Sequence, residues 1–467
     1  MRVLVVHQNF PGQFRHLVPE WQRRPGWEVR GLGRSGAPGL PGFEQLTRYP
    51  APDPGRAAHP YLGRMEQATR QGQAAARAMQ ALRREGFTPD LVVAHPGWGE
   101  SLYAKDVYPD ARVIHFCEWY YAARGADLGF DPEFPASLDD HARVRTWNAL
   151  HALNLLQCDA GVSPTHWQRS RHPGELQSKI AVQHEGIALD LLAPDPHACL
   201  AMPGGRRLCC GDPVVTYVAR NLEPYRGFHV FMRALGRLQA VHRSVHAVVI
   251  GADGVSYGSR PAGAPSWRER MLQEVPLDPA RTHFLGRVPY PIYVRALQVS
   301  AAHVYLSYPF VLSWSMLEAM ACGALVVGSD TPPVREVLRD GENGLLVPFF
   351  NVAGLVERLR MALEAPADFV RHRAQALADM APYSHAAGLT GYDGIIERAA
   401  GVSQVSVDTP CCNRIRLRDL NSRRTQNACP GMGTTTSRML NPPAETILSD
   451  WLPVRFTVVS NSRGTTG

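Results

Sequence analysis

Short apolar runs alternate with longer amphipathic stretches through residues 1–400 of the chain. The short runs have the length and composition of buried strands, and the longer stretches carry their apolar residues at helical spacing. This alternation predicts parallel β-sheets whose strands are connected by helices. In the first half, we expect strands at 3–6, 91–94, 113–116 and 161–163 and a helix at 64–85. In the second half, we expect strands at 214–218, 247–250, 283–285, 304–306 and 325–328 and helices at 228–238, 292–297, 315–321 and 352–364.

A stretch rich in proline, glycine and polar residues, 193–212, interrupts this alternation and is expected to be a linker. The sequence therefore predicts an α/β protein of two Rossmann-like, doubly wound domains, at 1–192 and 213–383. The helical residues 384–400 are expected to cross back to the first domain. Folds of this kind bind ligands at the carboxyl ends of their strands, so we expect a site in a cleft between the two domains.

The last part of the chain, 401–467, has neither helical nor strand periodicity and is expected to be a disordered tail without function. The formal net charge of the chain is +7, and eight arginines against four acidic residues put +4 of it in this tail. The remaining +3 forms no basic stripe along the sequence, so no nucleic-acid partner is expected. Peripheral contact with an anionic membrane surface stays open.

Nine cysteines show no CxxC spacing and no paired His/Cys array, so we expect neither a structural zinc site nor a disulfide framework. Such cysteine usage is typical of the reducing cytoplasm. The N-terminal apolar run is too short for a signal peptide. Residues 296–317 contain no charged residue, but their serines, glutamine, histidine and proline disfavour a membrane span. A buried strand, a loop and a helix explain that stretch better.

The strongest candidate site lies in residues 310–318, where a loop precedes a helix that is expected to begin near Ser313. The backbone N–H groups and the positive dipole end at such a start suit a diphosphate. Glu318 falls about one turn into the helix, where a carboxylate can accept both hydrogen bonds of a vicinal diol such as ribose. The alternative is an ordinary α/β unit in which Glu318 is solvated.

The spelling of the stretch favours the first interpretation. Leu317–Gly323 reads Leu-Glu-Ala-Met-Ala-Cys-Gly, and Val334–Val337 and Asp340–Val347 follow it. This succession resembles the family 4 retaining glycosyltransferases of group 1 type, which have the GT-B fold of two domains facing a cleft. The resemblance implies that Glu318 binds the ribose of a nucleotide-sugar donor. It extends over about residues 1–397 and is most specific in the second domain.

One departure from the family pattern concerns a second glutamate, which relatives carry eight residues before Glu318. That position is Phe310 here, and the glycine that usually opens the helix is Ser313. A phenyl ring cannot accept a hydrogen bond from the donor sugar as a carboxylate does. Whatever that carboxylate does in relatives is therefore absent or supplied by another residue. A divergent subgroup and an inactive enzyme both stay open.

Two arginines, Arg220 and Arg226, stand in the loop after the strand expected at 214–218. Two cations beside the cleft would neutralise a diphosphate and stabilise the leaving group as its bond to the sugar breaks. The resemblance implies this task for an arginine and a lysine, and Arg226 occupies the lysine position, which keeps the charge and changes the geometry. The alternative is a pair of surface arginines.

Three loops of the first domain offer further candidates. Gly12 follows the first strand, where relatives have a glycine-rich loop beside the donor phosphates. His95 follows the next strand and is either a site residue or a cap, and Glu118 stands near the place of a sugar-contacting histidine in relatives. His95, Glu118 and Phe310 are the candidate sugar or acceptor contacts. The segment His184–Ile187 is expected to be a structural turn.

Arg287 and Val288 belong to the loop after the strand expected at 283–285. In relatives, backbone atoms of this loop hold the nucleotide base. Backbone recognition leaves no side-chain code, so the identity of the base is not readable from the sequence.

The resemblance implies a retaining transfer of a hexose-type sugar from a nucleotide sugar to a saccharide or lipid-linked acceptor, as in cell-surface polysaccharide synthesis. The nucleotide sugar is a substrate, and neither a cofactor nor a metal ion is expected. The expected location is the cytoplasm, including the inner face of the membrane. Three alternatives stay open: a nucleotide-sugar 2-epimerase, a non-catalytic nucleotide-sugar-binding protein, and an NAD-dependent oxidoreductase. The absence of a dinucleotide fingerprint disfavours the last.

Overall fold

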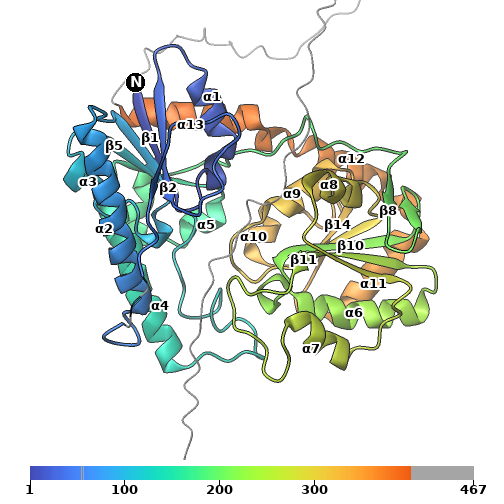
Figure 1. Cartoon of the computed structure of the whole chain (residues 1–467). Helices are drawn as coiled ribbons and strands as arrows, with labels where there is room; N and C mark the ends of the chain where they lie inside the picture. The colour runs from blue at the N-terminus through green and yellow to red at the C-terminus, as the bar shows by residue number, and fades with distance from the viewer. Residues whose placement is uncertain (54, 56, 401–467) are drawn as a thin grey trace, which may run out of the picture.

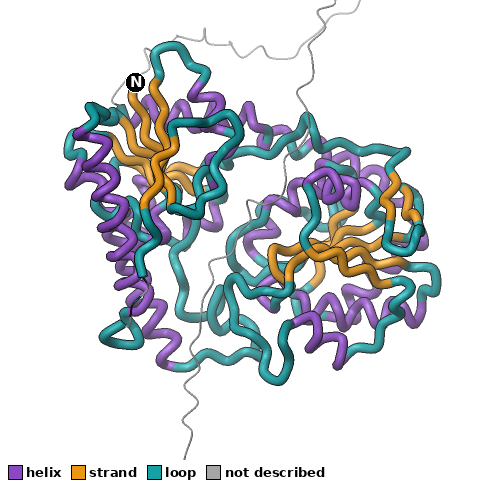
Figure 2. Tube along the Cα trace, in the orientation of Figure 1, coloured by secondary structure: helices purple, strands orange, loops and turns teal. Residues whose placement is uncertain are grey.

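The computed structural model describes residues 1–53, 55 and 57–400, so the tail expected at 401–467 lies outside the described residues. Each half of the described chain folds around its own parallel sheet, with helices on both faces (Figures 1 and 2). These are the two α/β domains that the alternation of apolar runs predicts.

The sheet of the first domain is parallel throughout and has the strand order β3-β2-β1-β4-β5-β6-β7. Its strands are β1 Arg2–Val6, β2 Glu28–Arg34, β3 Leu46–Tyr49, β4 Leu91–Ala94, β5 Arg112–Phe116, β6 Ala160–Ser163 and β7 Ile180–Val182. Its helices are α1 Leu17–Gln22, α2 Gly63–Arg84, α3 Ala104–Val107, α4 Leu138–Gln157 and α5 His166–Ser170.

Strand β1 shows why both faces of this sheet are covered. Successive side chains of a strand point to opposite faces. Leu4 and Val6 pack in the same cluster as Met79 of α2, whereas Val3 and Val5 pack with α1 and the C-terminal helix α13. A strand buried on both faces is apolar at nearly every position, which is why its sequence does not alternate.

The sheet of the second domain is also parallel and has the strand order β12-β11-β10-β13-β14-β15. Its strands are β10 Val214–Asn221, β11 His246–Ala252, β12 Thr282–Gly286, β13 Ala302–Tyr305, β14 Leu325–Ser329 and β15 Leu345–Val347. The helices are α6 Phe228–Val241, α7 Trp267–Glu274, α8 Tyr290–Gln298, α9 Trp314–Ala321, α10 Pro332–Arg335, α11 Val352–Glu364 and α12 Val370–Ala378.

Helices α6 and α11 contribute buried residues to one core cluster of this domain, and α8 and α9 contribute to the other. The charge-free stretch 296–317 contains the end of α8, strand β13, a loop and the start of α9, which agrees with the strand, loop and helix expected from the sequence. Among the described residues, no helix has both the length and the apolar composition that crossing a membrane requires.

The segment 193–212, expected to be a linker, contains a small antiparallel hairpin of β8 Cys199–Ala201 and β9 Arg207–Cys209. Leu200 and Leu208 pack into the core of the second domain. Cys199 and Cys209 are directly opposite in the hairpin and form a disulfide, which corrects the expectation that the cysteines would stay unbonded. The spacing gave no sign of this pair because an antiparallel hairpin, not a CxxC loop, brings the two cysteines together.

The last described helix, α13 His385–Ala399, packs on the first domain although it follows the second in sequence. Its Tyr392, Ile395 and Ile396 join the cluster that contains Val3 and Val5. Figure 1 shows this helix, in orange, running along the top of the first domain. The chain thus connects the two domains twice.

A third connection comes from residues 117–137, which leave β5 and reach α4 without forming a helix or strand; we call them the crossing segment. Although it belongs to the first domain by sequence, this segment packs on the second. Asp131 accepts a hydrogen bond from Tyr308 Oη (2.7 Å), and the Phe134 ring lies edge-on to His229 with 5.6 Å between centroids. The crossing segment therefore forms one wall between the domains.

Candidate functional site

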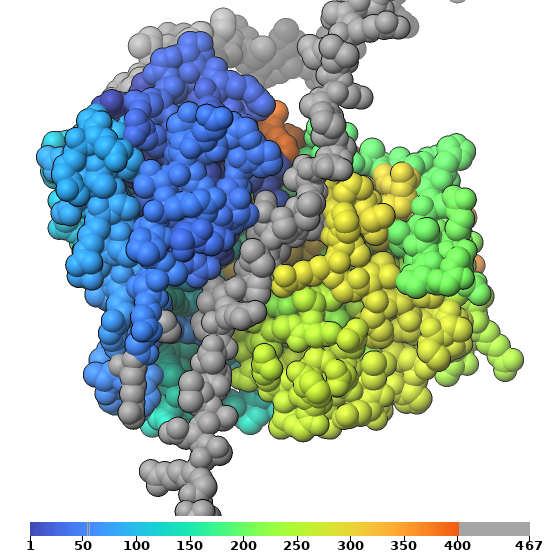
Figure 3. Space-filling model, viewed as in Figure 1, coloured from blue at the N-terminus to red at the C-terminus, as the bar shows by residue number. Residues whose placement is uncertain are grey.

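A cavity of about 1720 Å³ lies between the two domains. It is lined by the loops that follow β1, β4 and β5 in the first domain and β10, β11 and β13 in the second. Figure 3 shows the two domains as separate blue and green-to-yellow masses. Pockets for a drug-sized ligand occupy about 300–1,000 Å³, so this cavity has room for two substrates.

Helix α9 begins at this cavity. Ser313 is its N-cap, and the Ser313 hydroxyl accepts a hydrogen bond from the N–H of Ser315 (3.4 Å). The N–H of Ser313 itself donates to Tyr305 Oη (2.7 Å), which fixes the loop before the helix. Ser313 and Trp314 both line the cavity. The structure therefore presents the positive end of a helix to the cleft, at the residue that the sequence indicated.

The carboxylate of Glu318 is buried one turn further along α9. It accepts hydrogen bonds from Tyr290 Oη (3.1 Å) and from Tyr293 Oη, both on the neighbouring helix α8. Burial raises the pKa of this carboxyl above its usual value, although the two tyrosines and the charge of Arg15 act in the opposite sense. Within the described chain, Glu318 is not among the residues that line the cavity.

The two arginines after β10 both line the cavity. Arg226 is held firmly, because its Nη1 donates to Ser307 Oγ and to the carbonyl of Val311, each at 2.9 Å. Its guanidinium also lies 5.9 Å from the centroid of the Phe310 ring. Arg220 is exposed, and its charge lowers the pKa of Glu118 across the cleft. Both arginines thus line the cavity, Arg226 partly buried and Arg220 exposed.

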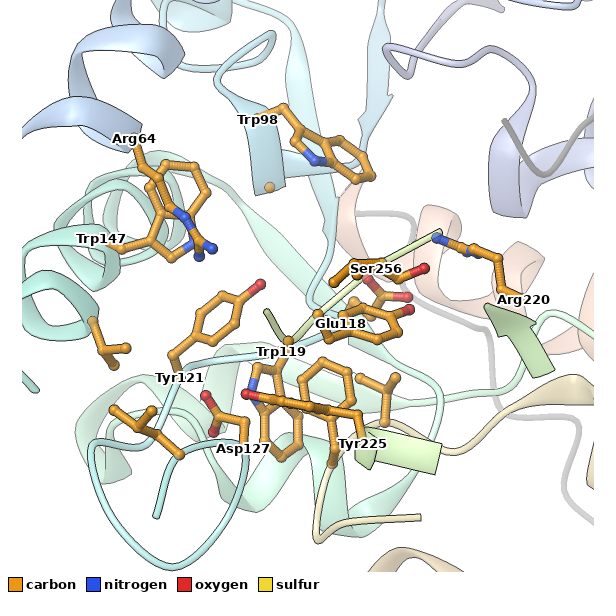
Figure 4. A pocket seen from close by; sticks show the side chains of 18 of the residues that line it. Arg64, Trp98, Glu118, Trp119, Tyr121, Asp127, Trp147, Arg220, Tyr225 and Ser256 are labelled. Atoms are coloured by element: carbon orange, nitrogen blue, oxygen red, sulfur yellow. The ribbon is translucent and has the colours of Figure 1, made fainter. Parts of the chain in front are cut away.

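Phe310 occupies an aromatic cluster at the cavity wall and is 3% exposed. Its ring meets those of Trp119 and Tyr257 edge-on, each with 4.9 Å between centroids, and that of Tyr225 at 5.8 Å. Trp119 belongs to the crossing segment, so the cluster joins the two domains. Figure 4 shows Trp119 and Tyr225 packed below Glu118 in the cavity.

His95 and Glu118 form a hydrogen-bonded pair at the opposite wall. His95 Nδ1 accepts from the N–H of Gly97 (3.0 Å), so the neutral ring carries its proton on Nε2 and donates it to Glu118 Oε2 (3.2 Å). Gln13 donates to the other oxygen of Glu118 (3.2 Å). His95 is therefore both the cap of the turn after β4 and a cavity residue, which combines the two interpretations of the sequence.

Gly12 lies in the loop that supplies Gln13 and lines the cavity. Its φ is +55°, and a Cβ at this position would lie 2.3 Å from the ring of His7. Glycine is therefore required here both by the backbone conformation and by the close approach of His7.

Arg287 lines the cavity after β12, whereas Val288 does not line it within the described chain and packs instead against the core of the second domain. The cavity thus brings together most of the residues selected from the sequence. Glu318 and Val288 lie behind its wall.

Comparison with known proteins identifies this arrangement. Residues 25–192 match the family described as glycosyl transferase family 4 group, and residues 212–365 match the glycosyl transferases group 1. The chain belongs to the family 4, group 1 type glycosyltransferases. The two matched regions include every strand of the two parallel sheets except β1, and they include the Glu318 helix.

Curated relatives of this glycosyltransferase are similar over part of their length. A D-inositol 3-phosphate glycosyltransferase of Kribbella flavida is 26% identical over 191 residues, which are 40% of this chain and 43% of that protein. A phosphatidyl-myo-inositol mannosyltransferase of Mycolicibacterium smegmatis is 32% identical over 157 residues, 32% of this chain and 36% of the relative. The chain thus spans less than half the length of the curated relatives it matches.

Solved structures show that the glycosyltransferase has the GT-B fold. The sucrose-phosphate synthase of Thermosynechococcus elongatus superimposes with a TM-score of 0.64 at 16% identity, covering 86% of this chain and 100% of that one. Anabaena HepE in complex with UDP-glucose superimposes with a TM-score of 0.59 at 14% identity, with coverage of 86% and 100%.

Several site residues of the glycosyltransferase were not selected from its sequence. Tyr290 and Tyr293, which hold Glu318, belong to a different helix, α8, and do not line the cavity within the described chain. Their spacing along the sequence did not mark them as partners of Glu318. Glu185 lines the cavity from the turn that was expected to be structural. Arg64, Trp98, Tyr121 and Trp147 also line the cavity, from the side of the first domain (Figure 4).

One further group of side chains lies where the crossing segment meets α6. Ligand atoms of Asp131, Glu133 and His229 lie within 4.8 Å of one another, the only such set of three among the described residues. Arg233 donates to Glu133 (Nη2 to Oε2, 2.9 Å), so a metal ion bound there would have to displace a guanidinium. As found, these groups join the crossing segment to the second domain.

Proposed function

We propose that the protein is a retaining glycosyltransferase that moves a hexose-type sugar from a nucleoside diphosphate sugar to a saccharide or lipid-linked acceptor. The observation that carries the proposal is the convergence of the α9 N-terminus, Arg220 and Arg226 on a single interdomain cavity. Three positive groups at one place suit a diphosphate better than any neutral ligand. Anabaena HepE, which has the same fold, binds UDP-glucose, and this supports a nucleotide-sugar donor.

In the proposed reaction, Arg220, Arg226 and the Ser313 end of α9 hold the diphosphate, and Glu318 binds the ribose. The hydrogen bonds of Arg226 to Ser307 and Val311 fix its guanidinium before the donor arrives. Groups fixed in this way stabilise the charge that develops on the leaving diphosphate without reorganisation. The Tyr290 hydroxyl has to leave Glu318 when the ribose diol binds, because it occupies one carboxylate oxygen.

The acceptor hydroxyl then attacks the anomeric carbon from the face that the diphosphate leaves, and its proton passes to the departing phosphate oxygen. The bond from the anomeric carbon to the acceptor oxygen replaces the bond to the phosphate oxygen on the same face. The anomeric configuration is therefore retained, without a covalent enzyme intermediate. Neither a metal ion nor a cofactor takes part in the proposed step, and activity that is unchanged by EDTA would agree with this.

The acceptor is proposed to bind in the part of the cavity lined by Arg64, Trp98, Tyr121 and Trp147. Flat aromatic rings give a saccharide broad apolar contact, and polar groups at their edges fix its orientation. The curated relatives are named for inositol-phosphate and phosphatidyl-myo-inositol acceptors, which supports a polyol acceptor, free or attached to lipid. A role in cell-surface polysaccharide synthesis in the cytoplasm, with peripheral membrane contact, fits such an acceptor.

A thermal-shift panel of UDP-, GDP- and ADP-sugars tests the donor. We expect one nucleotide series to raise the unfolding temperature, since a ligand that binds the native state stabilises it by mass action. The same donor with a panel of saccharide and inositol acceptors should then give a product with retained configuration, measured by NMR coupling constants. The absence of a shift with every nucleotide sugar would overturn the proposal.

Phe310 favours a second candidate, a non-catalytic nucleotide-sugar-binding protein, because no carboxylate stands at that position of the cavity wall. Such a protein would give the thermal shift and no turnover with any acceptor. A nucleotide-sugar 2-epimerase would convert the donor without an acceptor. Product analysis of donor alone and of donor with acceptor separates all three.

A further inference from the structure

Glu185 is a buried acid at the cavity whose surroundings leave one carboxyl oxygen unsatisfied. The residue is 2% exposed, and its Oε1 accepts a hydrogen bond from Trp314 Nε1 (2.7 Å). Its Oε2 is buried and has no hydrogen-bond partner among the described residues. Buried polar atoms are normally paired, so an unpaired oxygen at a cavity points to a bound group.

The position of Glu185 indicates the part of the donor that it meets. Its partner Trp314 is the first residue of α9, directly after the N-cap Ser313, and all three residues line the cavity. The guanidinium of Arg15 lies 5.3 Å from the ring centroid of Trp314 and so adds positive charge on the same side. The start of α9, with the Arg15 guanidinium beside it, therefore favours an anionic ligand.

The backbone around Glu185 is packed tightly against α13, which fixes the position from which the side chain extends. A Cβ on Gly388 of α13 would lie 2.4 Å from the Glu185 carbonyl oxygen, and one on Gly186 would lie 2.7 Å from backbone atoms of α13. The N–H of Ile187 donates to the carbonyl of Tyr383 (2.7 Å). The turn is therefore fixed against α13, and it presents Glu185 to the second domain in a defined place.

A charged carboxylate in this corner would repel a diphosphate, whereas a protonated carboxyl can donate to it. Burial, together with the charge of Glu118, raises the pKa of Glu185 to about 8, although its own backbone N–H, the Trp314 hydrogen bond and the charge of Arg15 act in the opposite sense. A further ionisable group is Tyr392 of α13, itself buried, whose pKa the charge of Glu185 raises. At neutral pH the side chain accordingly carries its proton.

We propose that Glu185 donates a hydrogen bond from its protonated carboxyl to a phosphate oxygen of the bound nucleoside diphosphate. Its Oε1 keeps the bond from Trp314, and Oε2, which is buried in this structure, turns its proton toward the phosphate when the nucleotide binds. This inference rests on the proposed function, since it requires a diphosphate at the start of α9. It adds to the positive groups of the second domain a neutral donor from the first.

Calorimetric titration with UDP, GDP and ADP between about pH 7 and about pH 9 tests the proposal. Binding that needs the protonated acid weakens as pH rises above the pKa of the free enzyme, by up to tenfold per pH unit. Glu185→Gln keeps an oxygen acceptor for Trp314 and replaces the carboxyl O–H by an amide N–H donor. The affinity of this variant for the nucleotide should therefore stay within about threefold of the wild type at pH 7 and should not fall at pH 9. Glu185→Ala should bind about tenfold more weakly at pH 7.

Glu100→Gln is a matched control, because Glu100 is also buried with one unpaired oxygen but does not line the cavity within the described chain. It should keep the pH dependence of the wild type. Equal pH dependence in wild type and Glu185→Gln would overturn the inference, as would unaltered affinity in Glu185→Ala. If Glu185→Ala does not fold, the Gln variant decides alone. If the wild type binds none of the three nucleotides, the proposed function itself is at fault.

Discussion

Oη of Tyr290 lies 3.1 Å from Oε1 of Glu318 and donates a hydrogen bond to it, so it occupies one oxygen of the carboxylate that is proposed to bind the donor ribose. The two residues come from neighbouring helices, α8 and α9, and Tyr293 donates to the second oxygen. Both acceptor positions that a vicinal diol would use are therefore filled by phenol groups. Donor binding has to exchange at least one of these hydrogen bonds for one from the ligand.

Replacing Glu318 by alanine should weaken binding of the nucleoside diphosphate by tenfold or more, because hydrogen bonds to a charged group contribute about 1.5–3 kcal/mol each. Isothermal titration of the nucleotide found in the thermal-shift panel measures this. Equal affinity in the wild type and Glu318→Ala would remove Glu318 from the donor site.

Tyr290→Phe should raise the affinity for the nucleotide by about threefold, since it removes a hydroxyl that competes with ribose for Glu318 Oε1 at a net cost of about 0.5–1.5 kcal/mol. The same titration measures it, with Tyr383→Phe as a tyrosine control outside the cavity. A tenfold loss instead would mean that the Tyr290 hydroxyl itself contacts the ligand.

Arg226→Lys should lower kcat by about a hundredfold, because one ammonium cannot keep the contacts to Ser307 and Val311 and also face the leaving diphosphate. Arg237→Lys, on the exposed side of α6, serves as the control and should leave kcat unchanged. Steady-state kinetics with saturating donor distinguish the two. Full activity in Arg226→Lys would show that the charge alone suffices.

Phe310→Ala should act through packing. Removing a buried phenyl ring costs about 3–5 kcal/mol, so the unfolding temperature should fall by several degrees while the affinity for the nucleotide changes less than threefold. Phe310→Leu should lose less of the stability, since it fills more of the cluster with Trp119 and Tyr257. A large loss of donor affinity in a folded Phe310→Leu variant would contradict this and give the ring a direct role.

The Glu118 carboxyl should make stability depend on pH. Burial opposes its charge, but the hydrogen bond from His95 and the charge of Arg220 hold its pKa below the usual value. A carboxyl with a lowered pKa stabilises the fold above its unfolded value of about 4.3 and loses this effect as pH falls through the folded value. Glu118→Gln should therefore lower the unfolding temperature at pH 7, with the difference vanishing in acid.

Glu85→Gln, at the exposed end of α2, is the control for that experiment. Its unfolding temperature should follow the wild type over the whole range. A Glu118→Gln variant that is as stable as the wild type at neutral pH would show that the pair with His95 contributes nothing to the folded state.

The sequence predicted strands best where both faces are buried. β4 Leu91–Ala94 agrees with its expected bounds, because a strand covered on both sides is continuously apolar. Strand β2 of the same sheet was not predicted because its Gly31 and Gly33 leave room for the ring of Phe10, so the strand has few apolar side chains to recognise. Helix α4 buries mixed residues such as Trp147 and Asn154, which blurs its apolar stripe.

The candidate site was predictable where function follows from position along the chain. Arg226 and Ser313 belong to the loops that follow β10 and β13, and the carboxyl edge of a parallel sheet brings such loops together. The partners of Glu318 and the exposure of Glu185 to the cavity depend instead on which helices pack side by side. Neither the spacing of Tyr290 and Tyr293 nor the turn at Glu185 indicates that packing.

The crossing segment has a consequence for how the cleft between the two domains opens. Because Asp131 and Phe134 are attached to the second domain, parting the domains must either break these contacts or carry the segment away with that domain. In the second case the chain would bend where the segment leaves β5 and where it enters α4. Trp119 would then travel with Phe310, and the cleft would widen along the side of His95 and Gly12.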